Sequence, residues 1–164
     1  MQSAAGVFID SQQKYAQEIV KKFQMEKCNS VGTPTEPGLK LMKNSRGKKV
    51  NNTLYKKIVG SLMYLTATRP DIKHGVSLVS RYMENPTEEH FLAAKRIFLY
   101  LQGTIDLGIF YKKGEQSSLI GFTDSDYAGD IDDRRSTSGH VFVMGTGTVS
   151  WSSKKQQVVY SILD

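Results

Sequence analysis

The chain centres on residues 119–155, LIGFTDSDYAGDIDDRRSTSGHVFVMGTGTVSWSSKK. Its first apolar run delivers Asp124 and Asp126 to its end, and two further apolar runs, 140–144 and 148–151, flank a Gly-Thr-Gly turn. This pattern predicts a strand, a long polar connection and a glycine-turned hairpin. Acids at the end of a strand can be presented to a cation while the core of the sheet stays dry, so this stretch is the first candidate for a functional site.

Length and composition limit the kind of protein this is. A chain of 164 residues that is 39% hydrophobic suffices for one domain, or two small ones, with a real core. No run approaches the roughly 18 to 20 apolar residues of a membrane span, and the start lacks the basic region of a signal peptide, so we expect no membrane partner. The single Cys28 excludes an internal disulfide and a cysteine metal cluster, which fits an intracellular, reducing compartment.

The net charge of +6 is unevenly distributed. Residues 1–118 carry 18 Lys and Arg against 10 Asp and Glu, whereas residues 119–164 carry 4 against 6. A basic body joined to a locally acidic end is typical of a polyanion binder with a cation site. The alternative is that these lysines only solvate the surface of helices.

Apolar periodicity predicts an α+β chain with its helices first and its strands together at the end. A strand at 6–9 and a helix over about 11–25 come first, and a strand at 107–111 precedes the central stretch. Between them, start signals predict three more helices, at Asn52, at Arg69-Pro70-Asp71 and at Asn85-Pro86-Thr87-Glu88.

A long connection without periodicity, residues 28–52, is the most basic part of the chain. From Lys40 to Lys57 there are seven Lys and Arg and no acid. Phosphate contacts of such residues position nucleic acid without reading its sequence, and they weaken with salt. The predicted phosphate track comprises Lys40, Lys43, Arg46, Lys48, Lys49, Lys56, Lys57, Lys95, Arg96, Lys154 and Lys155. Tyr55, Tyr64 and Tyr82 could stack on bases, although aromatic residues at helical spacing are more often core.

Three blocks of sequence resemble the Pol polyprotein of copia-type retrotransposons. The first is LYKKIVGSLMYLTATRPDI at 54–72, and the second spans 90–104, with His90, AAKRI, YL and GT. The third combines TDSDYAGD, STSG and VSWSSKKQ within 123–156. The blocks run in order over almost the whole chain, so the resemblance is far more specific than any single motif.

The resemblance implies that the chain is a fragment of that polyprotein. Residues 1–106 would be the C-terminal, thumb-like or connection-like helical region of the reverse transcriptase, and residues 107–164 the first strands of a truncated ribonuclease H domain. Such a fragment would hold an RNA–DNA hybrid, or other nucleic acid, beside the rest of the Pol polyprotein. The polymerase's paired aspartates would lie upstream of Met1. A helical Glu of the ribonuclease H site is expected near residues 160–164, where this sequence departs from the family pattern.

Asp124 matches the first-strand acid of the ribonuclease H site, which makes it the candidate catalytic and metal-binding residue. Ribonuclease H chemistry uses two Mg²⁺ ions held by several converging carboxylates. We therefore expect Mg²⁺ in the full-length family member, but only weak metal binding, and no stably bound ion, at Asp124 alone. Asp126 is expected to point away from Asp124. We expect Asp126, Asp130, Asp132 and Asp133 to form a solvated acidic loop. Arg134 and Arg135 would balance its negative charge.

Three hypotheses stay open on these grounds. The chain is a reverse transcriptase and ribonuclease H fragment that contributes RNA–DNA template binding and is catalytically silent alone. It is a non-catalytic, basic nucleic-acid-binding remnant, or it is the product of a decayed element with no selected role. In each case half of a ribonuclease H sheet, without its covering helix, should expose apolar surface and associate.

Overall fold

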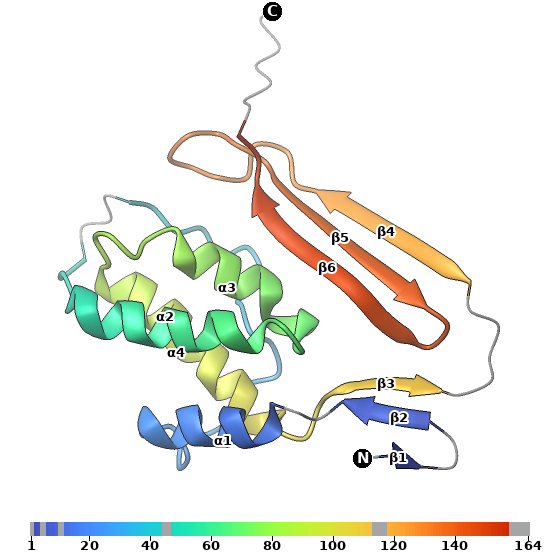
Figure 1. Cartoon of the computed structure of the whole chain (residues 1–164). Helices are drawn as coiled ribbons and strands as arrows, with labels where there is room; N and C mark the ends of the chain where they lie inside the picture. Colours follow the sequence, from blue (N-terminus) through green and yellow to red (C-terminus); the bar gives the residue numbers. More distant parts are fainter. Residues whose placement is uncertain (1, 4–5, 10–11, 44–46, 113–117, 158–164) are drawn as a thin grey trace, which may run out of the picture.

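The computed structural model describes the chain apart from residues 1, 4–5, 10–11, 44–46, 113–117 and 158–164, and within 2–9 it describes only the backbone. The described residues form a helical body and two small antiparallel sheets (Figure 1). The mixed α and β character predicted from the sequence is therefore confirmed.

Four helices build the body: α1 (Gln13–Lys22), α2 (Asn52–Leu65), α3 (Lys73–Ser80) and α4 (Glu88–Gly103), with a 3-10 turn, η1 (Pro70–Ile72), leading into α3. Their apolar stripes meet in one core, where Tyr55, Leu62 and Leu101 are completely buried. On α2 the apolar residues Ile58, Leu62 and Leu65 are buried, whereas Leu54 is 43% exposed. None of the helices in the described ranges is long and apolar enough to cross a membrane.

Two helix starts lie slightly away from the predicted signals. The side chain of Asn51, not Asn52, accepts the N–H of Leu54 at 2.9 Å and caps α2. The N-cap of α4 is Thr87, so Pro86 precedes the helix and does not occupy its first turn. The N-cap is the residue at which the backbone enters the helix. Asn and Pro residues nearby in the sequence locate this point only to within one or two positions.

The first sheet has the order β1-β2-β3 and joins both ends of the helical region. β1 (Gln2–Ser3) pairs with β2 (Gly6–Ile9), and β2 pairs with β3 (Ile109–Lys112). This last strand does not join the sheet of the C-terminal strands, but it lies beside them, since the Tyr111 hydroxyl donates to the carbonyl of Thr148 at 2.6 Å. Just before β3, the side-chain amide of Gln13 on α1 donates to the carboxylate of Asp106 at 2.6 Å, which ties the chain after α4 to α1.

The second sheet is the meander predicted for residues 119–155. It contains β4 (Leu119–Ser125), β5 (Thr137–Met144) and β6 (Gly147–Lys155) in that order, all antiparallel. Gly145 turns the β5–β6 hairpin with a φ of +60°, a conformation that glycine adopts without strain.

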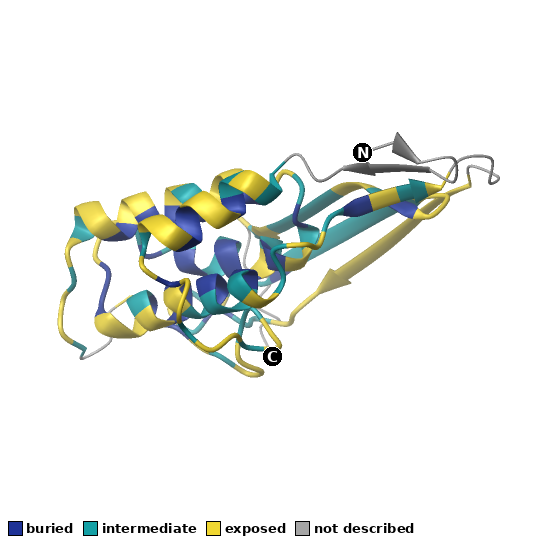
Figure 2. Ribbon diagram, turned by 90° about the horizontal axis from the view of Figure 1, so that it is seen from below, coloured by how far each residue is buried: buried dark blue, intermediate teal, exposed yellow. Residues whose placement is uncertain are grey.

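This sheet contacts the helical body through β6, whereas its other edge strand, β4, is exposed to solvent. The indole N–H of Trp151 on β6 donates to the carbonyl of Thr66, just after α2, at 2.8 Å. All seven residues of β4 are exposed, including Leu119 at 63% and Phe122 at 60% (Figure 2). The predicted exposure of apolar sheet surface is confirmed.

The long basic connection between α1 and α2 is anchored by two stacked rings. Tyr82 and His90 lie parallel with their centroids 3.9 Å apart. The Tyr82 hydroxyl donates to the carbonyl of Leu41 at 2.8 Å. Nδ1 of His90 accepts the N–H of Thr87 at 3.0 Å, so the proton sits on Nε2, which donates to the carbonyl of Met42 at 3.1 Å. One neutral imidazole thus caps α4 and holds the connection.

Titration of His90 should make the fold less stable in mild acid. Burial lowers the pKa of His90 from its ordinary 6.5, against smaller opposing effects of the bond to Met42 and the charges of Glu89 and Asp132. The unfolded chain therefore binds a proton at this imidazole more tightly than the folded chain does. The contribution of neutral His90 to the free energy of unfolding is complete above about pH 6.5 and is lost as the pH falls toward the folded-state pKa. Urea midpoints should drop between about pH 7 and about pH 5. A His90→Gln variant should lose most of this drop, and an equally steep variant profile would contradict the assignment.

The bare β4 strand should make the protein self-associate. An unpaired, apolar edge strand recruits another strand, and a lysine on it opposes that pairing. We expect Ile120→Lys to raise the dissociation constant for self-association about tenfold, measured by sedimentation. Thr53→Lys, which adds a lysine at an exposed position of α2 away from this edge, is the matched control. Equal effects of the two substitutions would show that added charge, not loss of apolar surface, is responsible.

Candidate functional site

A cleft of about 380 Å³ lies between the second sheet and the start of α3, and Asp124 is one of its walls. Phe122 and Trp151 line the sheet side, and Lys73 lines the helix side. Asp124 is exposed near the end of β4, and its Oδ1 accepts the N–H of Ser125 at 2.8 Å. The structure therefore places this candidate acid beside a hollow at the end of a strand.

Asp126 lines the same cleft, so the expectation that it points away from Asp124 is wrong. Side chains two residues apart along an extended strand share a face. Oδ1 of Asp126 is already engaged, because it accepts the N–H of Thr137 at 2.5 Å. Across the ranges that the structure describes, no three His, Cys, Asp or Glu side chains are placed to hold a metal ion. The metal role of Asp124 stays a prediction.

His74, next to Lys73 on α3, is a second titratable group on the helix wall of this cleft. Burial lowers its pKa, and the nearby charge of Arg81 lowers it further, while Asp126 acts weakly in the opposite direction. The imidazole is therefore neutral at physiological pH and adds no positive charge to the cleft.

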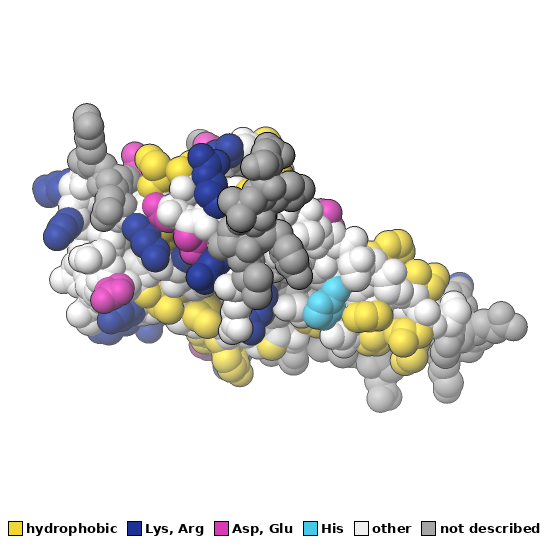
Figure 3. All heavy atoms as spheres, turned by 90° about the horizontal axis from the view of Figure 1, so that it is seen from above, with side chains coloured by type: hydrophobic (Ala, Val, Ile, Leu, Met, Phe, Trp, Pro, Cys, Tyr) yellow, Lys and Arg dark blue, Asp and Glu magenta, His cyan; other side chains and the backbone are white. Residues whose placement is uncertain are grey.

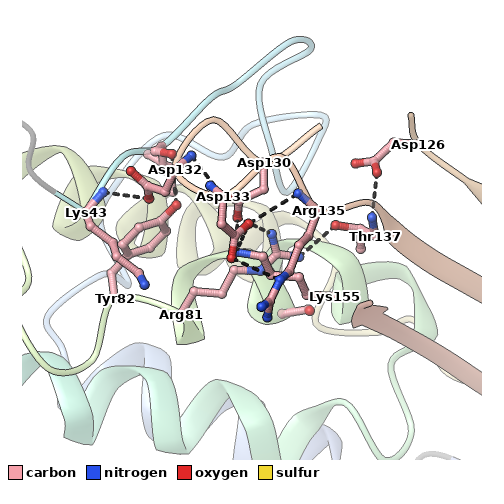
Figure 4. A network of polar contacts seen from close by, with 12 residues as sticks. Lys43, Arg81, Tyr82, Asp126, Asp130, Asp132, Asp133, Arg135, Thr137 and Lys155 are labelled. Carbon is pink, nitrogen blue, oxygen red and sulfur yellow. Dashed lines mark hydrogen bonds and ion pairs between the residues drawn. The ribbon is translucent and has the colours of Figure 1, made fainter. Parts of the chain in front are cut away.

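One buried carboxylate organises the acidic connection between β4 and β5 (Figure 4). Asp130 is 7% exposed. Its Oδ2 lies 2.6 Å from Nζ of Lys155 on β6 and 3.2 Å from Nη1 of Arg81 at the end of α3. Its Oδ1 accepts the N–H groups of Asp132 and Asp133. Burial by itself would raise the pKa of Asp130, but Lys155 and these hydrogen bonds lower it overall. The ionised carboxylate thus joins three elements.

The prediction of a solvated acidic loop is wrong at its centre. Arg81 and Lys155 balance Asp130, whereas Arg135 lies 3.5 Å from Asp133. Sequence reasoning missed Arg81 because it stands 49 residues before Asp130 and ends a helix without any motif. No local signal could have paired the two, since the contact depends on how the sheet docks on α3.

The predicted basic residues fall into those that already form ion pairs within the protein and those whose side chains are exposed. Arg96 lies 3.0 Å from Glu36, and Lys155 is taken by Asp130 and Asp133. Arg46 lies outside the described residues. The remaining eight lysines are exposed: Lys40, Lys43, Lys48, Lys49, Lys56, Lys57, Lys95 and Lys154. On the face seen in Figure 3, the basic side chains gather mostly over the helical end. Their contact with nucleic acid stays a prediction.

The three tyrosines predicted as candidates for base stacking differ in how far they are exposed. Tyr55 and Tyr82 are buried, and their hydroxyls donate to the carbonyls of Val79 and Leu41. Burial raises both pKa values, that of Tyr82 to about 12. Tyr64, in contrast, is 61% exposed. Only Tyr64, among these three, can offer its ring to a ligand.

The Arg-Pro-Asp signal of the first sequence block has a structural use. Arg69 is 4% exposed and forms a two-pronged ion pair with Asp71, with Nη2 and Oδ2 2.7 Å apart. Its Nη1 donates to the carbonyl of Thr104 at 3.0 Å, and Tyr100 donates to Asp71. This arginine therefore fastens the turn before α3 to the end of α4 and is not available to a phosphate.

Comparison with known proteins shows similarity to transposon polyproteins. The chain is 46% identical over 149 residues to the "Retrovirus-related Pol polyprotein from transposon RE1" of Arabidopsis thaliana, covering 91% of this chain and 10% of that protein. It is 42% identical to the corresponding polyprotein "from transposon TNT 1-94" of Nicotiana tabacum, over 91% of this chain and 12% of that protein. The "Uncharacterized mitochondrial protein AtMg00810" of Arabidopsis thaliana is 39% identical over 94% of this chain and 64% of its own length.

No protein-family model matches the chain, and no solved structure matches it significantly. The chain spans about a tenth of the length of the Pol polyproteins to which it is similar.

Loss of the Asp130 charge should destabilise the fold. In Asp130→Asn the amide can still accept the backbone N–H groups, but Arg81 and Lys155 lose their shared counter-charge in a largely buried place. We expect the free energy of unfolding to fall by about 3 kcal/mol in urea titration. Asp132→Asn is the matched control, since Asp132 is exposed in the same connection, and should cost less than about 1 kcal/mol. Equal stability of the two variants would contradict the central role of Asp130.

Proposed function

Because this chain belongs to the family of retrovirus-related Pol polyproteins of transposons, we propose that it joins the C-terminal helices of the reverse transcriptase to the first strands of the ribonuclease H domain. In the whole polyprotein this segment grips an RNA–DNA hybrid between the two active sites. By itself it binds nucleic acid and does not cut it.

The arrangement of helices and strands supports this position in the polyprotein. The helices α2, α3 and α4 come first, and the meander of β4, β5 and β6 follows after β3. Asp124 lies near the end of the first strand of this meander, beside a cleft. This is the place that the family resemblance gives to the first acid of a ribonuclease H site.

The single observation that carries nucleic-acid binding is the set of exposed lysines on and around the helical end. They lie on the connection before α2, on the first turns of α2 and on α4, and the structure leaves their side chains exposed. Ammonium groups of this kind neutralise phosphates and release counterions, which makes binding tight at low salt and independent of sequence.

The donor set around Asp124 argues against cutting by this chain alone. Two Mg²⁺ ions need several converging oxygen ligands, beyond those that the phosphate itself brings. In the cleft the acids are Asp124 and Asp126, and one oxygen of Asp126 is held by the backbone of β5. These residues do not fit a pair of cations, so the proposal assigns the cutting step to further acids of the larger protein.

Filter binding of an RNA–DNA hybrid tests this function. The logarithm of the binding constant should fall linearly with the logarithm of salt between about 50 and 200 mM. Replacing Lys56 and Lys57 by Gln should lower the magnitude of that slope by about 1 to 2. Lys14→Gln, an exposed change on α1 away from these lysines, should leave it unchanged. Binding that is absent at low salt, or flat with salt, would overturn the proposal.

The same hybrid, incubated with Mg²⁺, separates holding from cutting. We expect it to stay intact. Cleavage by the unaltered chain that disappears in Asp124→Asn would show that the chain assembles a working site alone, and would contradict the second half of the proposal.

A further inference from the structure

A shallow, wide-open depression of about 510 Å³ lies where the C-terminal end of α2 meets β6. We call it the α2–β6 groove. Met63 and Tyr64 line it from α2, Val149 and Trp151 from β6, and Lys73 from α3. Among the residues that the structure describes, no acidic side chain lines it. Met63 is 48% exposed and Tyr64 61% exposed, so the groove presents apolar and aromatic surface to water.

The two aromatic rings of the groove are held in place from behind. The ring of Tyr64 packs edge-on against Tyr15, with centroids 4.8 Å apart at 73°. The indole of Trp151 is fixed by its N–H, which donates to the carbonyl of Thr66. A ring whose orientation is already set loses little conformational freedom when a flat ligand stacks on it. Such rings are preformed platforms.

The charge of the groove favours an anionic ligand. Lys73 is half-buried on its wall, and none of the described carboxylates lies within ion-pair distance of its ammonium group. A ligand that combines flat rings with regularly spaced negative charges meets both features, and single-stranded nucleic acid is such a ligand. An acidic peptide would satisfy Lys73 but would gain less from an exposed tyrosine face.

The groove also adjoins the cleft that contains Asp124. Lys73 from α3 and Trp151 from β6 each line both hollows. A strand bound in the groove would therefore lie beside the cleft of Asp124.

We propose that the α2–β6 groove binds a single-stranded stretch of nucleic acid, with one base stacked on Tyr64 and a phosphate at Lys73. This inference rests on the proposed nucleic-acid binding and adds a defined site to it. The site recognises stacked bases and phosphate, which RNA and DNA share, and it guides the strand toward Asp124.

Trp151 is the only tryptophan of the chain, so its fluorescence reports on this groove directly. The probe is an oligothymidylate of about ten nucleotides, added at low salt. Trp151 is excited at a wavelength at which tyrosine does not absorb. We expect saturable quenching of Trp151. Tyr64→Leu should weaken the affinity about tenfold, while Tyr64→Phe, which keeps the ring, should retain it. Lys73→Gln should weaken it severalfold and reduce the dependence on salt.

Two controls make the result specific. Tyr127→Leu removes an aromatic side chain that is 82% exposed elsewhere on the surface, and it should leave the titration unchanged. An oligouridylate of equal length compares RNA with DNA. Quenching by both supports recognition of the shared bases and phosphates, and quenching by only one overturns that part of the proposal.

Failure of this site can be told apart from failure of the proposed function. If filter binding shows that the oligonucleotide and the hybrid bind but Trp151 fluorescence does not change, the groove is not the site, and the lysine-based function stands. Equal affinity of Tyr64→Leu and the parent protein also overturns the groove. If no nucleic acid binds at low salt, both proposals fall.

Discussion

The ionised carboxylate of Asp130 is the constraint on which the arrangement of this protein depends. It is buried between a guanidinium from the end of α3 and an ammonium from the end of β6, and it also caps two backbone N–H groups of its own connection. A buried charge is tolerated only when it is paired and hydrogen-bonded, and the partners must then stay in place. A sheet of three strands, which cannot bury both of its faces, is fixed to the helical body in this way.

This attachment decides where the hollows are. With the end of β6 held at Asp130 and Trp151 bonded to Thr66, the joint between the helices and the sheet contains the cleft beside Asp124 and the α2–β6 groove. Both share Lys73 as part of their walls. The opposite edge of the sheet, β4, stays bare. The chain therefore has one sheltered side suited to a ligand and one exposed side suited to pairing with another strand.

The blocks that relate this chain to Pol polyproteins contain many residues that build the fold. Arg69 fastens two helices, Trp151 joins α2 to β6, and Lys155 neutralises Asp130. Each has a polar group that a nucleic acid could bind, yet each is already engaged within the protein. The proposals for function therefore rest on the side chains left over, which are the exposed lysines, Tyr64, Lys73 and Asp124.

The sequence by itself determined the features that depend on local periodicity: four helices, the meander of residues 119–155, the glycine turn and the position of Asp124 near the end of a strand. The helices and strands follow from a 3.6- or two-residue repeat that neighbouring residues set together, and the turn follows from the backbone freedom of its glycine. Only the tertiary structure decided that β3 pairs with β2, that Asp130 binds Arg81 and Lys155, and that Tyr64 is exposed where Tyr55 is buried. These outcomes depend on how finished elements dock, and residues some fifty positions apart carry no local pattern that pairs them.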